Sequence, residues 1–186
     1  MRCFIAVDVE EPRLLDAIAE AQRRLQSTGA DLKLVERENL HITLRFLGEI
    51  SPSLAEAVGE LIREMSFKPF RVSFRGVGAF PNIHRPRVIW IGVSEGADEL
   101  RRLHTSIERG LLGLGFRGED RPFTPHLTIA RVRSGRNRDR LAMALESLID
   151  IEFGSLTISH VRLKRSTLTP RGPIYTTMAE SAPYEA

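Results

Sequence analysis

The feature that most constrains this chain is a four-residue pattern that occurs twice. His41-Ile42-Thr43-Leu44 and His126-Leu127-Thr128-Ile129 both read histidine, aliphatic, threonine, aliphatic. Alternate side chains of an extended strand share a face. Each copy therefore predicts a strand that shows its histidine and threonine on an open face and packs its aliphatic residues on a core.

The two copies lie 85 residues apart (126 − 41 = 85), and the same offset relates other parts of the chain. Phe4–Val7 matches Ile89–Gly92, both of them strand-like, and the helical pattern after Pro12 matches the one after Ala97. A repeat of this length indicates a pseudo-symmetric domain and not a solenoid. We therefore predict one domain over residues 1–186, with an internal repeat of about 85 residues that places two His-Thr pairs across a cleft.

Hydrophobic periodicity predicts an α+β fold of two pseudo-symmetric lobes, each an antiparallel sheet with helices outside, around a central groove. The closing strand is expected to pair back into the N-terminal lobe. Helical stripes begin near Pro12, Pro52, Leu100 and Arg138. Strands are expected at 3–8, 32–35, 40–47, 70–74, 87–93, 125–132, 151–158, 160–167 and 174–180. Glycines and prolines predict a loop over 76–86, either a lid or a simple turn.

Composition narrows the class of protein. The chain has 186 residues, 42% of them hydrophobic and 27% charged, which is typical of a globular protein. The single Cys3 excludes an intramolecular disulfide and a thiolate metal cluster. The first apolar run is too short for a signal peptide, and no stretch reaches membrane-spanning length. A cytoplasmic protein without a membrane partner is therefore expected.

A cluster of arginines gives the chain a basic segment. Arginines stand at positions 131, 133, 136, 138 and 140, the formal net charge is +3 and the sequence pI is about 9.5. Such a segment suits a polyanion such as nucleic acid. On charge alone, a solvated surface is the simpler interpretation.

Two facing histidines suit paired acid–base chemistry. An unperturbed imidazole titrates near pH ~6.5, so one ring can accept a proton while its partner donates one. Phosphodiester cleavage needs such a pair, one group for the nucleophile and one for the leaving oxygen. Thr43 and Thr128 add hydroxyl donors on the same faces, suited to phosphate oxygens.

Other interpretations of these residues stay open. The histidines could bind zinc, but neither motif has a third or fourth ligand nearby, and no metal or cofactor motif occurs elsewhere. They could also be two unrelated strand histidines. Of the remaining histidines, His84 is expected at the surface, and His104 and His160 are expected to be structural.

The chain resembles the 2H phosphoesterase superfamily, and within it the bacterial and archaeal RNA 2′,3′-cyclic phosphodiesterases, first called 2′-5′ RNA ligases. The resemblance rests on four stretches that span nearly the whole chain: Arg2–Asp8, His41–Glu49, His126–Arg131 and Ser166–Tyr175.

The resemblance implies a two-lobed α+β fold and opening of a 2′,3′-cyclic phosphate to a 2′-phosphomonoester without metal or cofactor. It implies that His41 is the general acid that protonates the leaving O3′ and that His126 is the general base that activates water. Thr43 and Thr128 would hold the phosphate, and Arg131 matches a family arginine near it. Strict alternation puts Arg131 opposite His126, so a β-bulge or its long side chain must bring it round.

Alternation also puts Phe46 on the core face, outside the site. The resemblance further implies RNA partners with 2′,3′-cyclic phosphate ends, tRNA fragments among them, and the reverse 2′-5′ ligation as a second reaction. A monomer is expected, although nothing in the sequence sets the oligomeric state. The alternative is a non-catalytic module that binds RNA or nucleotides in the same groove.

Overall fold

The structure of the protein is a computed structural model that describes residues 1–186. It contains nine strands, four α-helices and one short 3₁₀ helix. The strands are β1 (Arg2–Asp8), β2 (Leu32–Leu34), β3 (His41–Glu49), β4 (Phe70–Phe80), β5 (Val88–Glu95), β6 (His126–Val132), β7 (Glu152–Ile158), β8 (Arg162–Thr169) and β9 (Gly172–Glu180). The helices are α1 (Pro12–Gln26), the 3₁₀ helix Arg37–Asn39, α2 (Pro52–Glu64), α3 (Ala97–Gly113) and α4 (Arg138–Ser147).

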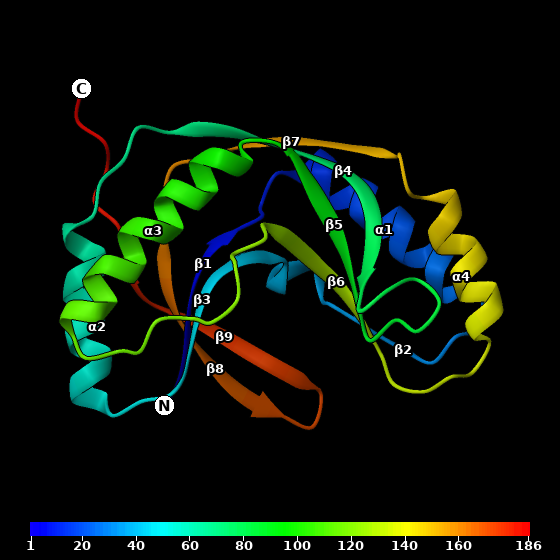
Figure 1. Ribbon diagram of the computed structural model, residues 1–186, viewed down its shortest axis with the longest axis horizontal. Helices are drawn as coiled ribbons and strands as arrows, with labels where there is room; N and C mark the ends of the chain where they lie inside the picture. Colours follow the sequence, from blue (N-terminus) through cyan, green and yellow to red (C-terminus); the bar gives the residue numbers. More distant parts are fainter.

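The strands form two antiparallel sheets, as predicted (Figure 1). The first sheet has the order β3-β1-β8-β9 and the second the order β2-β6-β5-β4-β7. Each sheet takes strands from both halves of the chain, because β8 pairs with β1 and β4 pairs with β5. The expected return of the closing strand is confirmed, since β9 pairs with β8 beside β1.

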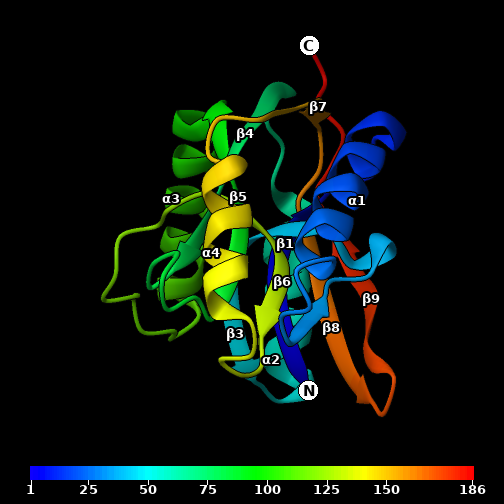
Figure 2. The ribbon, with the colours of Figure 1, turned by 90° about the vertical axis from the view of Figure 1, so that its right-hand side faces the viewer.

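Four helices flank the sheets, α2 and α3 at one end of the molecule and α1 and α4 at the other (Figures 1 and 2). Helices α1 and α2 start where the sequence places them. Glu11 and Ser51 cap them by accepting the backbone N–H of Leu14 and Leu54, and a proline follows each cap. Helix α1 packs on β6, β7 and α4, while α2 packs on β8 and β9. No helix is both long and apolar enough to cross a membrane.

One apolar cluster runs through both sheets. Ile5 and Ile42 of the first sheet and Ile89 and Leu127 of the second are all fully buried in it. Burying a side chain of this size stabilises a fold by roughly 1.5–3 kcal/mol. The aliphatic residues of both motifs are therefore core residues, which leaves the opposite face of each motif strand to its histidine and threonine.

The region 76–86 differs from the prediction. Strand β4 continues to Phe80, and only the residues between it and β5 form a turn. Gly76 adopts a φ of 76° where the pairing with β5 shifts register, and a Cβ at Gly78 would collide with the ring of Trp90. Both glycines belong to a strand because a bulge and an aromatic ring require them there.

Several element ends also differ from the sequence interpretation. Strand β3 runs through Gly48 to Glu49, β8 covers Arg162–Thr169, and α4 ends at Ser147, although its apolar stripe continues to Ile149. Gly48 has a φ of 69°. It therefore bends the end of the strand without stopping it.

Candidate active site

A bulge in β3 decides which side chains stand beside His41. In the pairing with β1, Ala6 faces Thr43 and Ile5 faces Arg45, so Leu44 is the extra residue. Leu44 and Arg45 are both buried, at 2% and 8% exposure. The next residue, Phe46, returns to the side of His41, is 64% exposed and lies with its ring 6.4 Å from that of Phe4. The prediction that Phe46 belongs to the core face was wrong, because strict alternation does not survive a bulge.

Strand β6 has the same bulge at the equivalent place. Thr128 faces Trp90 and Ala130 faces Ile89, so Ile129 is the extra residue. Ile129 and Ala130 are both fully buried, and Arg131 after them is exposed. This is the bulge that Arg131 needs in order to lie on the side of His126. We call the surface formed by His41, Thr43, Phe46, His126, Thr128 and Arg131 the histidine face.

The two motif strands bring these residues to one place. Strands β3 and β6 lie beside each other although they belong to different sheets. Tyr175 of β9 links the two sides, since its ring lies 5.4 Å from that of His41 and the charge of Arg131 acts on its hydroxyl. Burial raises the pKa of Tyr175, and the positive charges of Arg131 and Arg2 oppose that rise.

Both motif histidines are held in the same way. The Nδ1 atom of His41 lies 2.7 Å from the carbonyl oxygen of Asn39, and that of His126 lies 2.7 Å from the carbonyl oxygen of Thr124. A carbonyl oxygen can only accept, so Nδ1 carries the hydrogen in both rings. The Nε2 atom of each ring is therefore the one available to take or give a proton.

The two Nε2 atoms have different surroundings. That of His41 lies 2.9 Å from the hydroxyl oxygen of Thr43, whereas that of His126 has no hydrogen-bond partner within the protein. The rings of Phe80 and Trp90 stand around His126, at 5.1 Å and 6.4 Å. The rings of Phe4 and Tyr175 stand around His41. Aromatic walls of this kind fix the orientation of both imidazoles.

Burial lowers the pKa of His41 below its ordinary value. The positive charge of Lys164 and the neighbouring His126 lower it further, while the hydrogen bond to Asn39 and the charge of Asp8 oppose the shift. The electrostatic influence of His126 shows that the two imidazoles lie close enough to act on each other. Before a ligand arrives, the His41 ring therefore favours its neutral form.

A partly buried ion-pair network lies next to His41. Asp8 faces His41 across the β1–β3 pairing and accepts hydrogen bonds from Lys164 at 2.9 Å and Arg162 at 2.7 Å. Burial alone would raise the pKa of Asp8, but these two hydrogen bonds hold it below its ordinary value. Sequence reasoning missed this network because Asp8 and Lys164 are 156 residues apart. The alternation of polar residues along 162–166 was the available signal.

Two cavities lie away from the histidine face. One, of about 430 Å³, is bordered by β2 and α1 and includes Lys33, Arg37 and Arg133 in its lining. The other, of about 200 Å³, lies beside α3 and includes Phe67, Phe70 and Leu103 in its lining.

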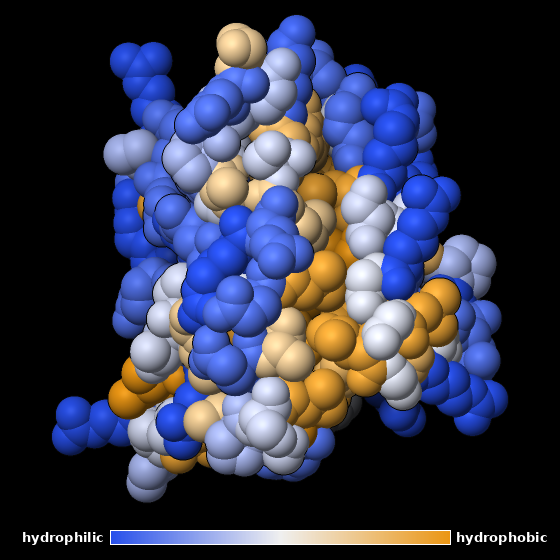
Figure 3. Space-filling view, turned by 90° about the vertical axis from the view of Figure 1, so that its left-hand side faces the viewer, coloured by the Kyte–Doolittle hydropathy of each residue, from blue (hydrophilic) through white to orange (hydrophobic).

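Figure 3 shows apolar side chains gathered in a band between hydrophilic rims on the face over α2 and α3.

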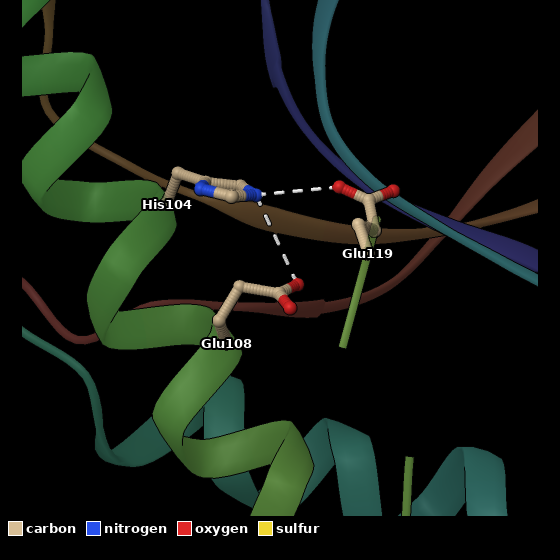
Figure 4. A group of neighbouring side chains, drawn as sticks. All are labelled: His104, Glu108 and Glu119. Atoms are coloured by element: carbon tan, nitrogen blue, oxygen red, sulfur yellow. Dashed lines mark ion pairs between the residues drawn. The ribbon is translucent and has the colours of Figure 1, made fainter. Parts of the chain in front are cut away.

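The structure also gathers one possible metal-ligand set that sequence reasoning did not find. Ligand atoms of His104, Glu108 and Glu119 all lie within 4.8 Å of one another (Figure 4). His104 and Glu108 are four residues apart on α3, which was the available signal, but Glu119 comes from the segment after the helix. The set contacts Arg45, on the side of β3 opposite the histidine face. Of the other histidines, His84 is exposed and His160 lies near Ser181 and Glu180.

Two antiparallel sheets with flanking helices, and a His-x-Thr strand from each sheet on one shared face, define an α+β protein of the two-histidine phosphoesterase class. Residues 11–167 match the model of the 2′-5′ RNA ligase superfamily. The chain belongs to this family.

Relatives of known function and structure agree with this placement. The chain is 47% identical over 168 residues to the RNA 2′,3′-cyclic phosphodiesterase of Aeropyrum pernix, covering 90% of this chain and 92% of that protein. It is 43% identical to the protein of the same name from Methanothermobacter thermautotrophicus, over 96% of each chain. Among solved structures, TT0787 of Thermus thermophilus superposes with a TM-score of 0.76 at 32% identity, over 97% of this chain and 96% of the other.

Proposed function

We propose that the protein hydrolyses the 2′,3′-cyclic phosphate ends of RNA to 2′-phosphomonoesters, with its two motif histidines as acid and base and without a metal ion. The observation that carries this function is the matched pair of imidazoles. Each has its Nδ1–H fixed on a backbone carbonyl and its Nε2 on the histidine face. Homologues named for this activity cover nearly the whole chain, which supports the same conclusion.

His126 is the general base. Its Nε2 has no partner in the protein, so a water molecule can bind there and give up a proton as it attacks phosphorus. His41 is the general acid that protonates the leaving O3′. In-line displacement places the attacking water and the leaving oxygen on opposite sides of the phosphate, and two histidines from facing strands meet that requirement.

The phosphate itself is held by hydroxyls and a guanidinium. Thr43 and Thr128 lie two residues after the histidines on the same faces, and the hydroxyl of Thr128 can donate a hydrogen bond to a non-bridging oxygen. The hydroxyl of Thr43 donates to Nε2 of neutral His41 and becomes free to donate to the phosphate when that ring takes up its proton. Arg131 follows the bulge of β6, makes no ion pair in the protein and adds a positive charge at the edge of the site. Together they neutralise the charge that develops on the phosphate in the transition state.

The lowered pKa of His41 fits an acid that is loaded by its substrate. The partial burial of this imidazole and the nearby charge of Lys164 both favour its neutral form. A phosphodiester anion next to the ring reverses the balance, because an opposite charge within a few ångströms favours the imidazolium. His41 therefore takes up its proton as the RNA end binds and is ready to give it to O3′.

The RNA beyond the reacting phosphate binds to the basic segment that continues from Arg131. Arg133, Arg136, Arg138 and Arg140 form no ion pair with a carboxylate, whereas Arg23, Arg63 and Arg101 on the other helices do. Cations that no carboxylate of the protein neutralises are free to bind backbone phosphates. Fragments of tRNA are suitable substrates.

The protein acts as a monomer. Residues 1–186 form one domain with an internal repeat, which is supported by the fact that each sheet takes strands from both halves of the chain.

The same pair of histidines also serves 2′-5′ ligation. When a ribose 5′-hydroxyl takes the place of water, His126 accepts its proton and His41 protonates the leaving O3′, so that two RNA ends are joined through a 2′-5′ bond. Cleavage of that bond back to the cyclic phosphate exchanges the two roles, and the similar fixing of both Nδ1 atoms suits each histidine to either role. Ligation is a second outcome of one site and needs no further residues.

Incubation with cytidine 2′,3′-cyclic phosphate in EDTA tests the proposal. Chromatography should show the 2′-monophosphate as product, at the same rate with and without the chelator. A protein that binds the nucleotide and leaves it intact would be a binding module. A rate that vanishes in EDTA would point to a metal-bound hydroxide as nucleophile.

A further inference from the structure

Arg45, beside the bulge of β3, is a buried charge with every side of its guanidinium occupied. Its side chain is 9% exposed. Nη1 donates to both carboxylate oxygens of Glu108, at 2.7 and 2.8 Å, and Nη2 donates to the carbonyl oxygen of Arg117 at 2.7 Å. Nε donates to the carbonyl oxygen of Phe46 at 3.2 Å. A buried cation with this many acceptors has one orientation.

These acceptors connect the first motif strand to the approach to the second. Glu108 is on α3, and Arg117 lies in the segment 114–125, which joins α3 to β6 without a helix or strand of its own. His126 follows directly after that segment. Arg45 therefore reaches from the bulge that positions Phe46 to the chain that leads into the other histidine.

The far end of the segment has a second anchor. Phe123 stacks on His104 of α3, with ring centroids 4.4 Å apart and an angle of 11° between the rings. The carboxylate of Glu119 lies 3.5 Å from Nε2 of His104 (Figure 4). The same carboxylate lies 3.8 Å from Nε of Arg45. The residue after Phe123 is Thr124, whose carbonyl oxygen holds Nδ1 of His126.

We propose that Arg45 is a positioning residue, which holds the segment 114–125 against β3 so that the carbonyl of Thr124 fixes the ring of His126. Its hydrogen bond to Phe46 holds the β3 bulge at the same time. One buried guanidinium thus fixes the positions of the two motif strands relative to each other. The kinetic consequences rest on the proposed function, whereas the structural consequences do not.

Metal binding at the same cluster is the competing interpretation. His104, Glu108 and Glu119 offer ligand atoms within 4.8 Å of one another, and Nε2 of His104 is buried without a hydrogen-bond partner. However, Arg45 already occupies both oxygens of Glu108. A metal cation would have to displace the guanidinium from Glu108, and the positive charge of Arg45 would then repel it at close range. The contacts therefore favour Arg45 as the resident cation of this cluster.

Arg45→Lys is the first test. A lysine keeps the charge and can reach Glu108, but one ammonium cannot also span the carbonyls of Arg117 and Phe46. We expect kcat for cytidine 2′,3′-cyclic phosphate to fall by about 10- to 100-fold with KM little changed, as for a misplaced reacting group. Arg63→Lys is the matched control, because Arg63 pairs with Glu56 and Glu60 on exposed α2. An Arg45→Lys protein with the kcat of the wild type would overturn the proposal.

The double variant Arg45→Met/Glu108→Met separates positioning from simple stabilisation. It replaces the ion pair by apolar side chains of similar length, which often preserves stability. We expect the melting temperature of the double variant to be close to that of the wild type while its kcat stays low. A double variant with both the melting temperature and the kcat of the wild type would show that Arg45 only stabilises the fold.

Two readouts test the positioning without any turnover. In Arg45→Lys, amide hydrogen exchange over 114–125 and solvent exchange of the His126 Nδ1–H proton, followed by NMR, should both become faster than in the wild type and in Arg63→Lys. If the wild type does not turn over the substrate, the proposed function fails and this comparison still decides the proposal. Unchanged exchange would overturn it. Stoichiometric Zn²⁺ binding that is lost in His104→Gln would also overturn it.

Discussion

At the scale of single residues, the side chains of the histidine face have two kinds of role. The two imidazoles carry the chemistry, and the other side chains support it. His41→Ala and His126→Ala should each lower turnover of cytidine 2′,3′-cyclic phosphate by ~10²–10⁴-fold, because each removes a general acid or base. Both rings are only half-buried, so the far-ultraviolet circular dichroism should not change. His84→Ala, in an exposed turn, is the control and should turn over normally. Near-normal turnover in either motif variant would contradict the paired mechanism.

The two threonines should matter less than the histidines. Thr43→Ala and Thr128→Ala each remove one neutral donor to the phosphate, and a lost oxyanion donor elsewhere costs about 2.7–4 kcal/mol at most. We expect a partial loss of kcat in each and a larger loss in the double variant. Steady-state kinetics measures this directly. A double variant with full activity would make both hydroxyls structural.

The pKa of His41 predicts proton uptake on binding. Because burial holds this pKa low, the free protein carries a neutral ring near neutral pH. The bound phosphodiester anion raises the pKa, so the complex holds one more proton and affinity should weaken as pH rises. Calorimetry of cytidine 2′,3′-cyclic phosphate binding to inactive His126→Ala, in two buffers of different ionisation enthalpy, measures the uptake. The His41→Gln/His126→Ala protein is the control, and equal heats in both buffers for His126→Ala would contradict the prediction.

At the scale of the elements, the motif strands show where sequence reasoning succeeds and where it stops. Alternation correctly placed His41 and Thr43 on one face and Ile42 in the core, because apolar burial decides the register of a strand. It failed at Phe46, since Leu44 and Arg45 both face inward. A buried arginine is tolerated there only because Glu108, 63 residues away, meets its charge. No local pattern reveals such a partner.

The glycines of β4 give a testable case of the same kind. Gly78 looks like a loop residue, yet it lies in a strand under the ring of Trp90, where a Cβ has no room. Gly78→Ala should lower the free energy of unfolding by about 1–3 kcal/mol, as overpacking does. Because Trp90 is the only tryptophan, its fluorescence should shift as the ring moves. Denaturant unfolding followed by this fluorescence measures both effects.

Gly113→Ala is the matched control for that variant. It is the same substitution at the end of α3, where an added Cβ meets nothing within 4 Å. Alanine favours a helix over glycine by up to roughly 1 kcal/mol, so this protein should be as stable as the wild type or slightly more stable. If the two variants had equal stability, the contact of Trp90 with Gly78 would carry no energetic weight.

At the scale of the whole molecule, the sequence predicts two sheets and two motif strands. It does not predict how strands from the two halves of the chain pair within each sheet. The insertion of β8 between β1 and β9 brings Lys164 beside Asp8, and it follows from pairing between strands more than 150 residues apart. The cluster of His104, Glu108 and Glu119 depends equally on tertiary packing. These groups act on the site through space, so only the folded chain reveals them.

The arginines of the basic segment that continues from Arg131 form no ion pairs, and this predicts how the affinity for RNA depends on salt. Each single-strand phosphate contact should contribute ~0.7 log units of affinity per log unit of salt. The triple variant Arg136→Gln/Arg138→Gln/Arg140→Gln should therefore bind a long RNA with a shallower salt slope, while its turnover of cytidine 2′,3′-cyclic phosphate stays normal. Arg23→Gln/Arg63→Gln/Arg101→Gln is the control, because it removes the same charge from arginines already paired within their helices. Fluorescence anisotropy across a salt series measures both slopes, and equal slopes for the two triple variants would show that the basic segment is only a solvated surface.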